Sequence, residues 1–198
     1  MKKEIKILLI FFIFTFSQNT LLKANEKKLS DIPSIIDAIV QNIVEIAEEK
    51  QGEDVPVCSS NSTKTYMDAD AITDTTSQQW RLLQTMYPNE KGIYQTEDGY
   101  LGVALGSTYG EIGSTYIVTL ENGKKLPIIK VDEKADVDTI NGCYQKYDGS
   151  VMEFVIDSEK AAAYYGISDN GYILSGNFNN HSEYKGSIIK MQKIKKGR

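Results

Sequence analysis

The chain has 198 residues, with 22 Lys and Arg against 27 Asp and Glu, one His, 12 Tyr and two Cys. Its formal net charge of −5 argues against nucleic acid as the main partner, because binding to phosphates requires an excess of basic side chains. A single histidine and two cysteines far apart in the sequence argue against a zinc site. We therefore expect neither a metal nor another cofactor.

Residues 1–24 have the pattern of a secretory signal peptide. Lysines at the start precede the apolar run Ile7–Phe16, and the small residue Ala24 stands at a plausible cleavage point. The run is too short to cross a bilayer, which needs about 20 apolar residues. We expect a secreted, extracellular protein that leaves the membrane after cleavage, the alternative being an uncleaved N-terminal anchor. Cleavage would leave 18 basic and 26 acidic side chains.

Residues 25–50 contain a predicted amphipathic helix. Over residues 30–49, apolar residues recur at helical spacing: Ile32, Ile35, Ile36, Ile39, Val40, Ile43, Val44 and Ala47. Such an apolar stripe must be buried, either by docking on the downstream domain, by self-association, or against a protein partner. Residues 51–63 then change to Gly, Pro, Ser, Asn and acids, a composition typical of a linker.

Residues 64–198 predict a mainly β domain. Short segments rich in Val, Ile and Tyr follow one another: Gly99–Leu105, Thr115–Leu120, Leu126–Val131, Val151–Ile156, Tyr172–Leu174 and Gly186–Lys190. An extended piece at 64–68 and a helical stretch, Ser77–Met86, come before them, and one short helix is expected at Ser158–Tyr165. Six strands with no βαβ alternation predict a small closed barrel. The basic tail, Lys190–Arg198, would either touch anionic wall polymer or be solvated without a role.

Four segments of this domain carry a further pattern: Gly102–Ser107, Ile112–Tyr116, Ile129–Asp132 and Gly149–Asp157. They resemble the double-psi β-barrel, and within it the three-aspartate (3D) domain of Gram-positive cell-wall proteins. That domain is related in fold to the C-terminal barrel of membrane-bound lytic transglycosylase A. The resemblance covers about residues 64–190. It implies a six-stranded double-psi β-barrel that acts on peptidoglycan glycan strands by lytic transglycosylation.

The resemblance also implies three aspartates, of which this chain keeps one. Asp132 matches the second, Glu153 takes the place of the third, and Gly106 stands where the first would be. Asp132 is the candidate catalytic acid/base, at the end of an apolar strand, with Glu153 as the second carboxylate. Lytic transglycosylation needs one carboxylic acid that is held protonated, and no metal. The alternative role of Asp132 is to cap the turn that follows.

Other residues are candidates for contact with the glycan. Asp136 and Asp157 add carboxylates nearby, and Tyr109 and Tyr116 could stack on sugar rings. Asp157 could instead cap the Ser158–Tyr165 helix, and strand tyrosines are more often packed in a core. Two functions stay open: an exported, cell-wall-associated lytic transglycosylase, or a barrel that binds peptidoglycan or a protein without turnover.

The two cysteines, Cys58 and Cys143, leave two alternatives open as well. In an exported protein they could form a disulfide that ties residues 51–63 to the main domain, or they could be two free thiols. A catalytic pair of Cys143 with His181 is disfavoured, because Asn141-Gly142-Cys143 is a turn sequence and does not start a helix.

Overall fold

A computed structural model describes residues 52–167, 173 and 176–194. The chain divides into two compact units, Met1–Glu48 and Glu49–Arg198, and every described residue belongs to the second. The predicted signal peptide, the predicted helix of residues 30–49 and the end of the basic tail lie outside the described residues.

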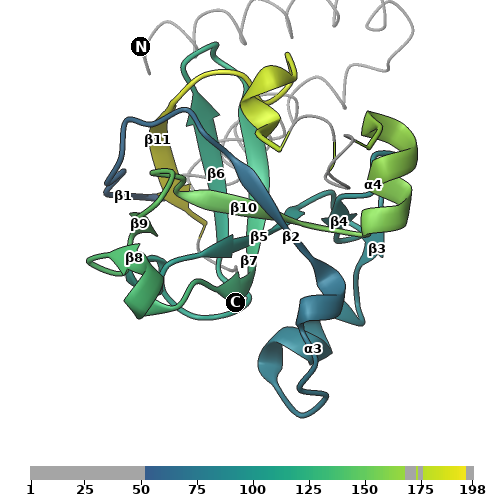
Figure 1. The fold of residues 1–198 in the computed structure, drawn as a ribbon. Helices are drawn as coiled ribbons and strands as arrows, with labels where there is room; N and C mark the ends of the chain where they lie inside the picture. The colour runs from purple at the N-terminus through teal and green to yellow at the C-terminus, as the bar shows by residue number, and fades with distance from the viewer. Residues whose placement is uncertain (1–51, 168–172, 174–175, 195–198) are drawn as a thin grey trace, which may run out of the picture. The chain divides into compact units, whose positions relative to one another are not determined.

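The described unit is mainly β, with two α-helices, α3 (Gln78–Leu83) and α4 (Ser158–Tyr165) (Figure 1). The strands are β1 (Glu53–Val55), β2 (Thr65–Asp68), β3 (Tyr87–Pro88), β4 (Tyr94–Gln95), β5 (Leu101–Leu105), β6 (Thr115–Leu120), β7 (Lys125–Glu133), β8 (Thr139–Ile140), β9 (Tyr144–Gln145), β10 (Met152–Ile156) and β11 (Ile188–Lys193). The mainly β class agrees with the sequence prediction, although there are more strands than the six expected.

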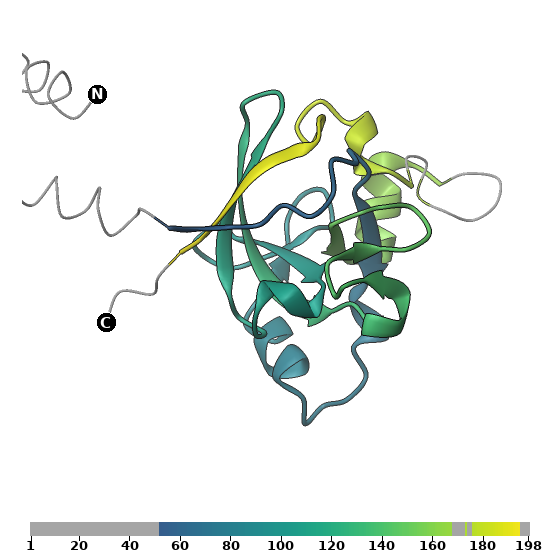
Figure 2. The same ribbon diagram turned by 90° about the vertical axis from the view of Figure 1, so that its left-hand side faces the viewer.

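Nine of these strands form one mixed sheet. Its main path runs in the order β1-β11-β6-β7-β5-β10-β2, with β4 joined to β5 and β3 joined to β4. The pairs β5–β7 and β10–β2 are parallel, and the other pairs are antiparallel. Strands β8 and β9 form a separate two-stranded sheet. In Figure 2, β6, β7 and β11 lie on one side of the unit, and β2 and α4 lie on the other.

The two faces of the sheet bury two different apolar clusters. Side chains that alternate along a strand point to opposite faces, so Phe154 of β10 belongs to the large cluster and its neighbour Val155 to the small one. The large cluster takes residues from β5, β6, β7, β10 and β11. The small cluster is covered by the segment around α3, where Leu83 and Met86 pack with Val131.

Local signals explain the elements that the sequence predicted well. Helix α4 begins after Asp157, whose side chain accepts a hydrogen bond from the backbone N–H of Lys160, and ends at Gly166 with φ of 84°. The hairpin between β6 and β7 turns at Gly123, whose φ of 81° suits glycine. Only Ile173 of the predicted strand Tyr172–Leu174 lies within the described residues, where it forms an isolated bridge with Ile167.

The prediction of a linker at 51–63 is wrong for the part that the structure describes. Strand β1 pairs with β11, with Glu53 opposite Lys193, and Cys58 is joined covalently to Cys143. The Gly-, Pro- and Ser-rich composition shows that the segment has no periodic pattern, but it does not show that the segment lacks fixed partners. Among the helices of the described residues, none has the length and hydropathy needed to span a membrane.

Candidate functional site

Asp132 and Glu153 lie in one row across three neighbouring strands. Ala104 of β5 is opposite Asp132 of β7 on one side and opposite Glu153 of β10 on the other. Residues directly opposite each other in a sheet project from the same face, and two strand spacings put the two Cα atoms about 10 Å apart. The structure therefore brings together the two carboxylates that the sequence singled out, with a small side chain between them.

A bulge in β7 creates this register. Val103 pairs with Lys130, but the next residue, Ala104, pairs with Asp132, so that Val131 is the extra residue. Without this extra residue Asp132 would be opposite Leu105, whose side chain belongs to the large core cluster. The bulge thus turns Asp132 towards the face that carries Glu153.

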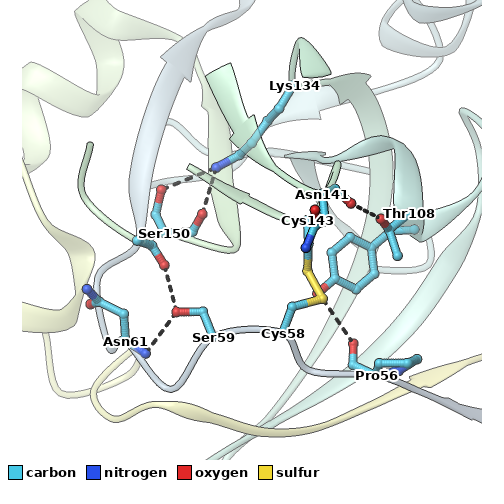
Figure 3. The surroundings of a disulfide bond; sticks show 11 residues. Pro56, Cys58, Ser59, Asn61, Thr108, Lys134, Asn141, Cys143 and Ser150 are labelled. Carbon is cyan, nitrogen blue, oxygen red and sulfur yellow. Dashed lines mark hydrogen bonds between the residues drawn. A yellow bond between two sulfur atoms is a disulfide. The ribbon is translucent and has the colours of Figure 1, made fainter. Parts of the chain in front are cut away.

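Glu153 is paired with a buried lysine. The Nζ atom of Lys134 lies 3.1 Å from Glu153 Oε1, and the side chains of Lys134 and Glu153 are 3 % and 18 % exposed. The same Nζ donates to the carbonyl and the hydroxyl of Ser150, at 3.1 and 3.2 Å (Figure 3). Burial lowers the pKa of Lys134, and the charge of Glu153 opposes this shift. Glu153 therefore compensates a buried charge, which gives it a structural role.

Asp132 is in a different situation. It is partly exposed, and its carboxylate has no hydrogen bond or ion pair with any other residue that the structure describes. The predicted alternative, in which Asp132 caps the following turn, has no supporting contact. The carboxylate is therefore available to a ligand.

Gly106, where the family resemblance would place an aspartate, has no room for a side chain. A Cβ atom on Gly106 would lie 2.0 Å from the carbonyl oxygen of Gly142. That carbonyl is fixed, since it accepts a hydrogen bond of 3.0 Å from the backbone N–H of Thr108. The glycine at 106 is therefore required by the close approach of the turn at Gly142.

The two remaining carboxylates lie outside the row. Asp136, in a 3-10 turn after β7, is exposed and accepts a 2.6 Å hydrogen bond from Ser107 Oγ. Asp157 caps α4 through the backbone N–H of Lys160 at 2.9 Å, as the alternative interpretation of the sequence has it. Neither contact connects these side chains to Asp132 or Glu153.

The prediction that Tyr109 and Tyr116 stack on sugars is wrong, because both rings are buried. Their exposed fractions are 2 % and 1 %, and the two rings pack edge to face in the large core cluster. The hydroxyl of Tyr116 donates to the carbonyl of Tyr109. Burial raises the pKa of Tyr109 to about 12. Tyrosine content alone does not distinguish a ring that packs from a ring that faces solvent.

The disulfide joins Cys58 to Cys143, with a Cα–Cα distance of 6.2 Å. It fastens residues 58–61 beside the turn that follows β9 (Figure 3). Ser59 Oγ donates to the carbonyl of Gly149 at 3.0 Å, and Asn61 Nδ2 donates to the carbonyl of Asp148 at 2.8 Å. Of the two alternatives that the sequence left open, the structure has the disulfide.

Sequence analysis missed Lys134 and Ser150. A lysine after a strand is usually a surface charge, and only the tertiary structure encloses this one. A signal was present, since Lys134 stands two residues after Asp132 and therefore on the same face of the chain.

An open hollow of about 490 Å³ lies away from Asp132 and Glu153, at the ends of β6 and β11, and is lined by residues that include Glu53, Glu111, Ser114 and Lys193. Within residues 52–167, 173 and 176–194, no group of three His, Cys, Asp or Glu is arranged to hold a metal ion.

Comparison of the chain with protein-family models, curated proteins and solved structures gives no match. The chemistry of the site therefore rests on the residues of this chain alone.

Proposed function

We propose that the chain is an exported, cell-wall-associated protein whose double-psi β-barrel binds peptidoglycan glycan strands without cleaving them. This proposal rests on the three positions where the family resemblance implies an aspartate. Glu153 is paired with the buried Lys134 at 3.1 Å, and Gly106 has no room for a side chain. Of the three positions, Asp132 alone has a carboxylate that is available to a ligand.

The strand arrangement supports a double-psi β-barrel. Two parallel pairs, β5–β7 and β2–β10, flank the antiparallel pair β5–β10 in a symmetric way. With β6 and β11 they make six strands, the number that the family resemblance implies. The residues that precede β2 and β11 also lie close together, since Lys64 Nζ donates to the carbonyl of Gly186 at 2.6 Å.

Binding without turnover agrees with the charges in the row. A general acid must carry a proton before it can give one to the glycosidic oxygen, whereas Glu153 is an ion-pair partner of Lys134. The Cα atom of Asp132 lies across β5, about 10 Å from that of Glu153, and two unit charges at such a separation in water interact by only about 0.4 kcal/mol. The two carboxylates therefore do not form a closely coupled acid pair.

The second candidate is a lytic transglycosylase with Asp132 as acid/base. The observation that favours it is the partly exposed carboxylate of Asp132, which has no partner among the described residues. One such carboxylate is enough for the chemistry, because the same group can protonate the leaving oxygen and then accept a proton from the sugar hydroxyl that closes the anhydro ring.

Digestion of purified sacculi by the exported chain separates the two candidates. We expect the protein to sediment with sacculi and to release no anhydro-muropeptides. Release that disappears in Asp132→Asn, but persists in the matched exposed control Asp98→Asn, would establish the transglycosylase. Failure to sediment with sacculi would reject the cell-wall function altogether.

A further inference from the structure

The turn between β9 and β10 exposes an aromatic side chain. Tyr147 is 87 % exposed, and Val137, in the 3-10 turn before β8, is 74 % exposed. The two segments are in contact, since Lys146 Nζ donates to the carbonyl of Val137 at 2.5 Å. A tyrosine this exposed contributes little to the core and leaves its ring faces open to solvent.

The turn is held in place from several sides. The backbone N–H of Lys146 donates to the carbonyl of Asp138 at 2.9 Å, and that of Gly149 donates to the carbonyl of Gln145, also at 2.9 Å. From the other side, Asn61 Nδ2 donates to the carbonyl of Asp148. The backbone that carries Tyr147 is therefore fixed, and binding does not have to order the turn itself.

The same turn leads directly to the carboxylate row. Ser150, three residues after Tyr147, accepts two hydrogen bonds from Lys134, which pairs with Glu153. Asp148 is close enough for its charge to raise the pKa of Lys134. The exposed ring and the row thus belong to one end of the domain.

We propose that Tyr147 is a stacking subsite for a neutral N-acetylated hexose of a glycan chain, beside the Asp132–Glu153 row. This inference rests on the proposed function and adds the residue whose ring stacks on the sugar. An aromatic face with a polar hydroxyl tip suits a sugar ring, which has an apolar face and polar edges. The neighbouring Asp136 and Asp148 oppose an anionic polymer, because like charges repel it.

The size of the exposed apolar surface favours a sugar over a protein. A stable protein interface buries about 800 Å² on each partner, whereas the large exposed apolar side chains of these two contacting segments are those of Tyr147 and Val137. Exposed charged residues stand next to both in the sequence, Asp136 before Val137 and Lys146 before Tyr147. One ring with polar neighbours matches the footprint of a single sugar unit.

The test uses the N-acetylglucosamine hexamer and purified sacculi as probes for the full exported chain. We expect hexamer binding to shift the backbone amide NMR signals of residues 146–150, and Tyr147→Ala to weaken binding about fivefold. Tyr147→Phe should keep most of the affinity, because the ring face remains. The matched control is Tyr164→Ala, which removes a tyrosine that is 52 % exposed on α4.

The outcomes separate this inference from the proposed function. Sacculus binding that is equal in wild type and Tyr147→Ala overturns the stacking subsite and leaves the wall-binding function standing. Sacculus binding without any hexamer binding overturns the neutral hexose as the ligand. Equal losses in Tyr147→Ala and Tyr164→Ala overturn the subsite too, since they show no preference for this turn. No sacculus binding by the wild type overturns the proposed function and, with it, the subsite.

Discussion

Two regions of the domain are held in place by different forces. The first, which we call the hairpin region, comprises residues 134–150 with residues 58–61. It is fastened by the Cys58–Cys143 disulfide, by the Lys134–Glu153 ion pair and by hydrogen bonds to the carbonyls of residues 148 and 149. The second, the α3 region, comprises residues 69–86 and is fastened by apolar packing on the sheet.

The α3 region shows what packing alone achieves. Ile72, Leu83 and Met86 bury their side chains against the sheet face that carries Val131 and Val155. Such contacts are not directional, and similar side chains can replace one another with small losses. The hairpin region uses bonds that fix both distance and direction. Fixed geometry is what a ligand site needs, and the candidate site borders the hairpin region through the Lys134–Glu153 ion pair.

The largest expected effect comes from removing the disulfide. We expect the double substitution of Cys58 and Cys143 by Ser to lower the free energy of unfolding by about 2–5 kcal/mol, because the bond closes a loop across a sequence separation of 85 residues. Urea denaturation measures the loss, with the wild type under reducing conditions as control. A loss below about 1 kcal/mol would show that the other bonds hold the hairpin region by themselves.

The ion pair should come next. Glu153→Gln leaves the ammonium group of Lys134 buried without its carboxylate and is expected to cost about 3 kcal/mol. The matched control is Glu133→Gln, since Glu133 pairs with the buried Lys130 but is 45 % exposed, and Lys130 keeps two carbonyl partners. Equal losses of unfolding free energy in the two variants would mean that burial of the carboxylate does not change the contribution of the ion pair to stability.

In the α3 region, Leu83→Ala is expected to cost about 2–3 kcal/mol through the cavity it leaves. Leu83→Met should cost less than about 1.5 kcal/mol, because apolar packing tolerates a change of shape at similar volume. Chemical denaturation of both variants tests the idea that this region is held without directional bonds. A methionine variant as unstable as the alanine variant would contradict it.

Another buried lysine, Lys64, differs from Lys134 in its hydrogen-bond partners. Among the described residues, the partners of the buried Lys64 ammonium group are the carbonyls of Ser62 and Gly186, and burial lowers its pKa to about 8. Because the unfolded chain binds this proton more tightly, stability should rise as the pH increases from about 8 towards 10.5. We expect a gain of about 1–2 kcal/mol between pH 8 and 9.5, measured by urea denaturation. Lys64→Met should remove this gain, and an unchanged pH profile in that variant would assign it to other groups.

The smallest effect is expected at the helix cap. The side chain of Ser77 accepts a hydrogen bond from the backbone N–H of Trp80 at the start of α3. Ser77→Ala should cost about 1 kcal/mol, and Ser77→Asp should keep most of the stability. Thermal unfolding of the two variants distinguishes a lost cap from a general disturbance of the α3 region.

Local sequence signals were enough for much of the fold. Strand β6 and helix α4 have the predicted bounds, because alternating apolar residues and a capping aspartate act within a few residues of the chain. Strand β1 was not predicted, since its three residues become a strand only through pairing with β11. Pairing of this kind depends on contacts far along the chain.

The candidate site also has features that the sequence predicted and features that it did not. Asp132 and Glu153 were predicted as site residues through the family resemblance, and the structure places them opposite the same residue of β5. The bulge at Val131 and the burial of Lys134 were not predicted, because both follow from strand register and enclosure. The sequence also does not show which tyrosines are buried: Tyr109 is 2 % exposed and Tyr147 is 87 % exposed, because tertiary position decides the burial of each ring.

The close approach of Gly106 to the turn at Gly142 limits how this protein can be redesigned. Placing an aspartate at 106 would force its Cβ atom into a backbone oxygen, so the turn would have to move first. Moving the turn would also displace Cys143, and with it the bridge to Cys58. An acidic side chain at position 106 would therefore demand a remodelled turn, and a single exchange of residues would not supply it.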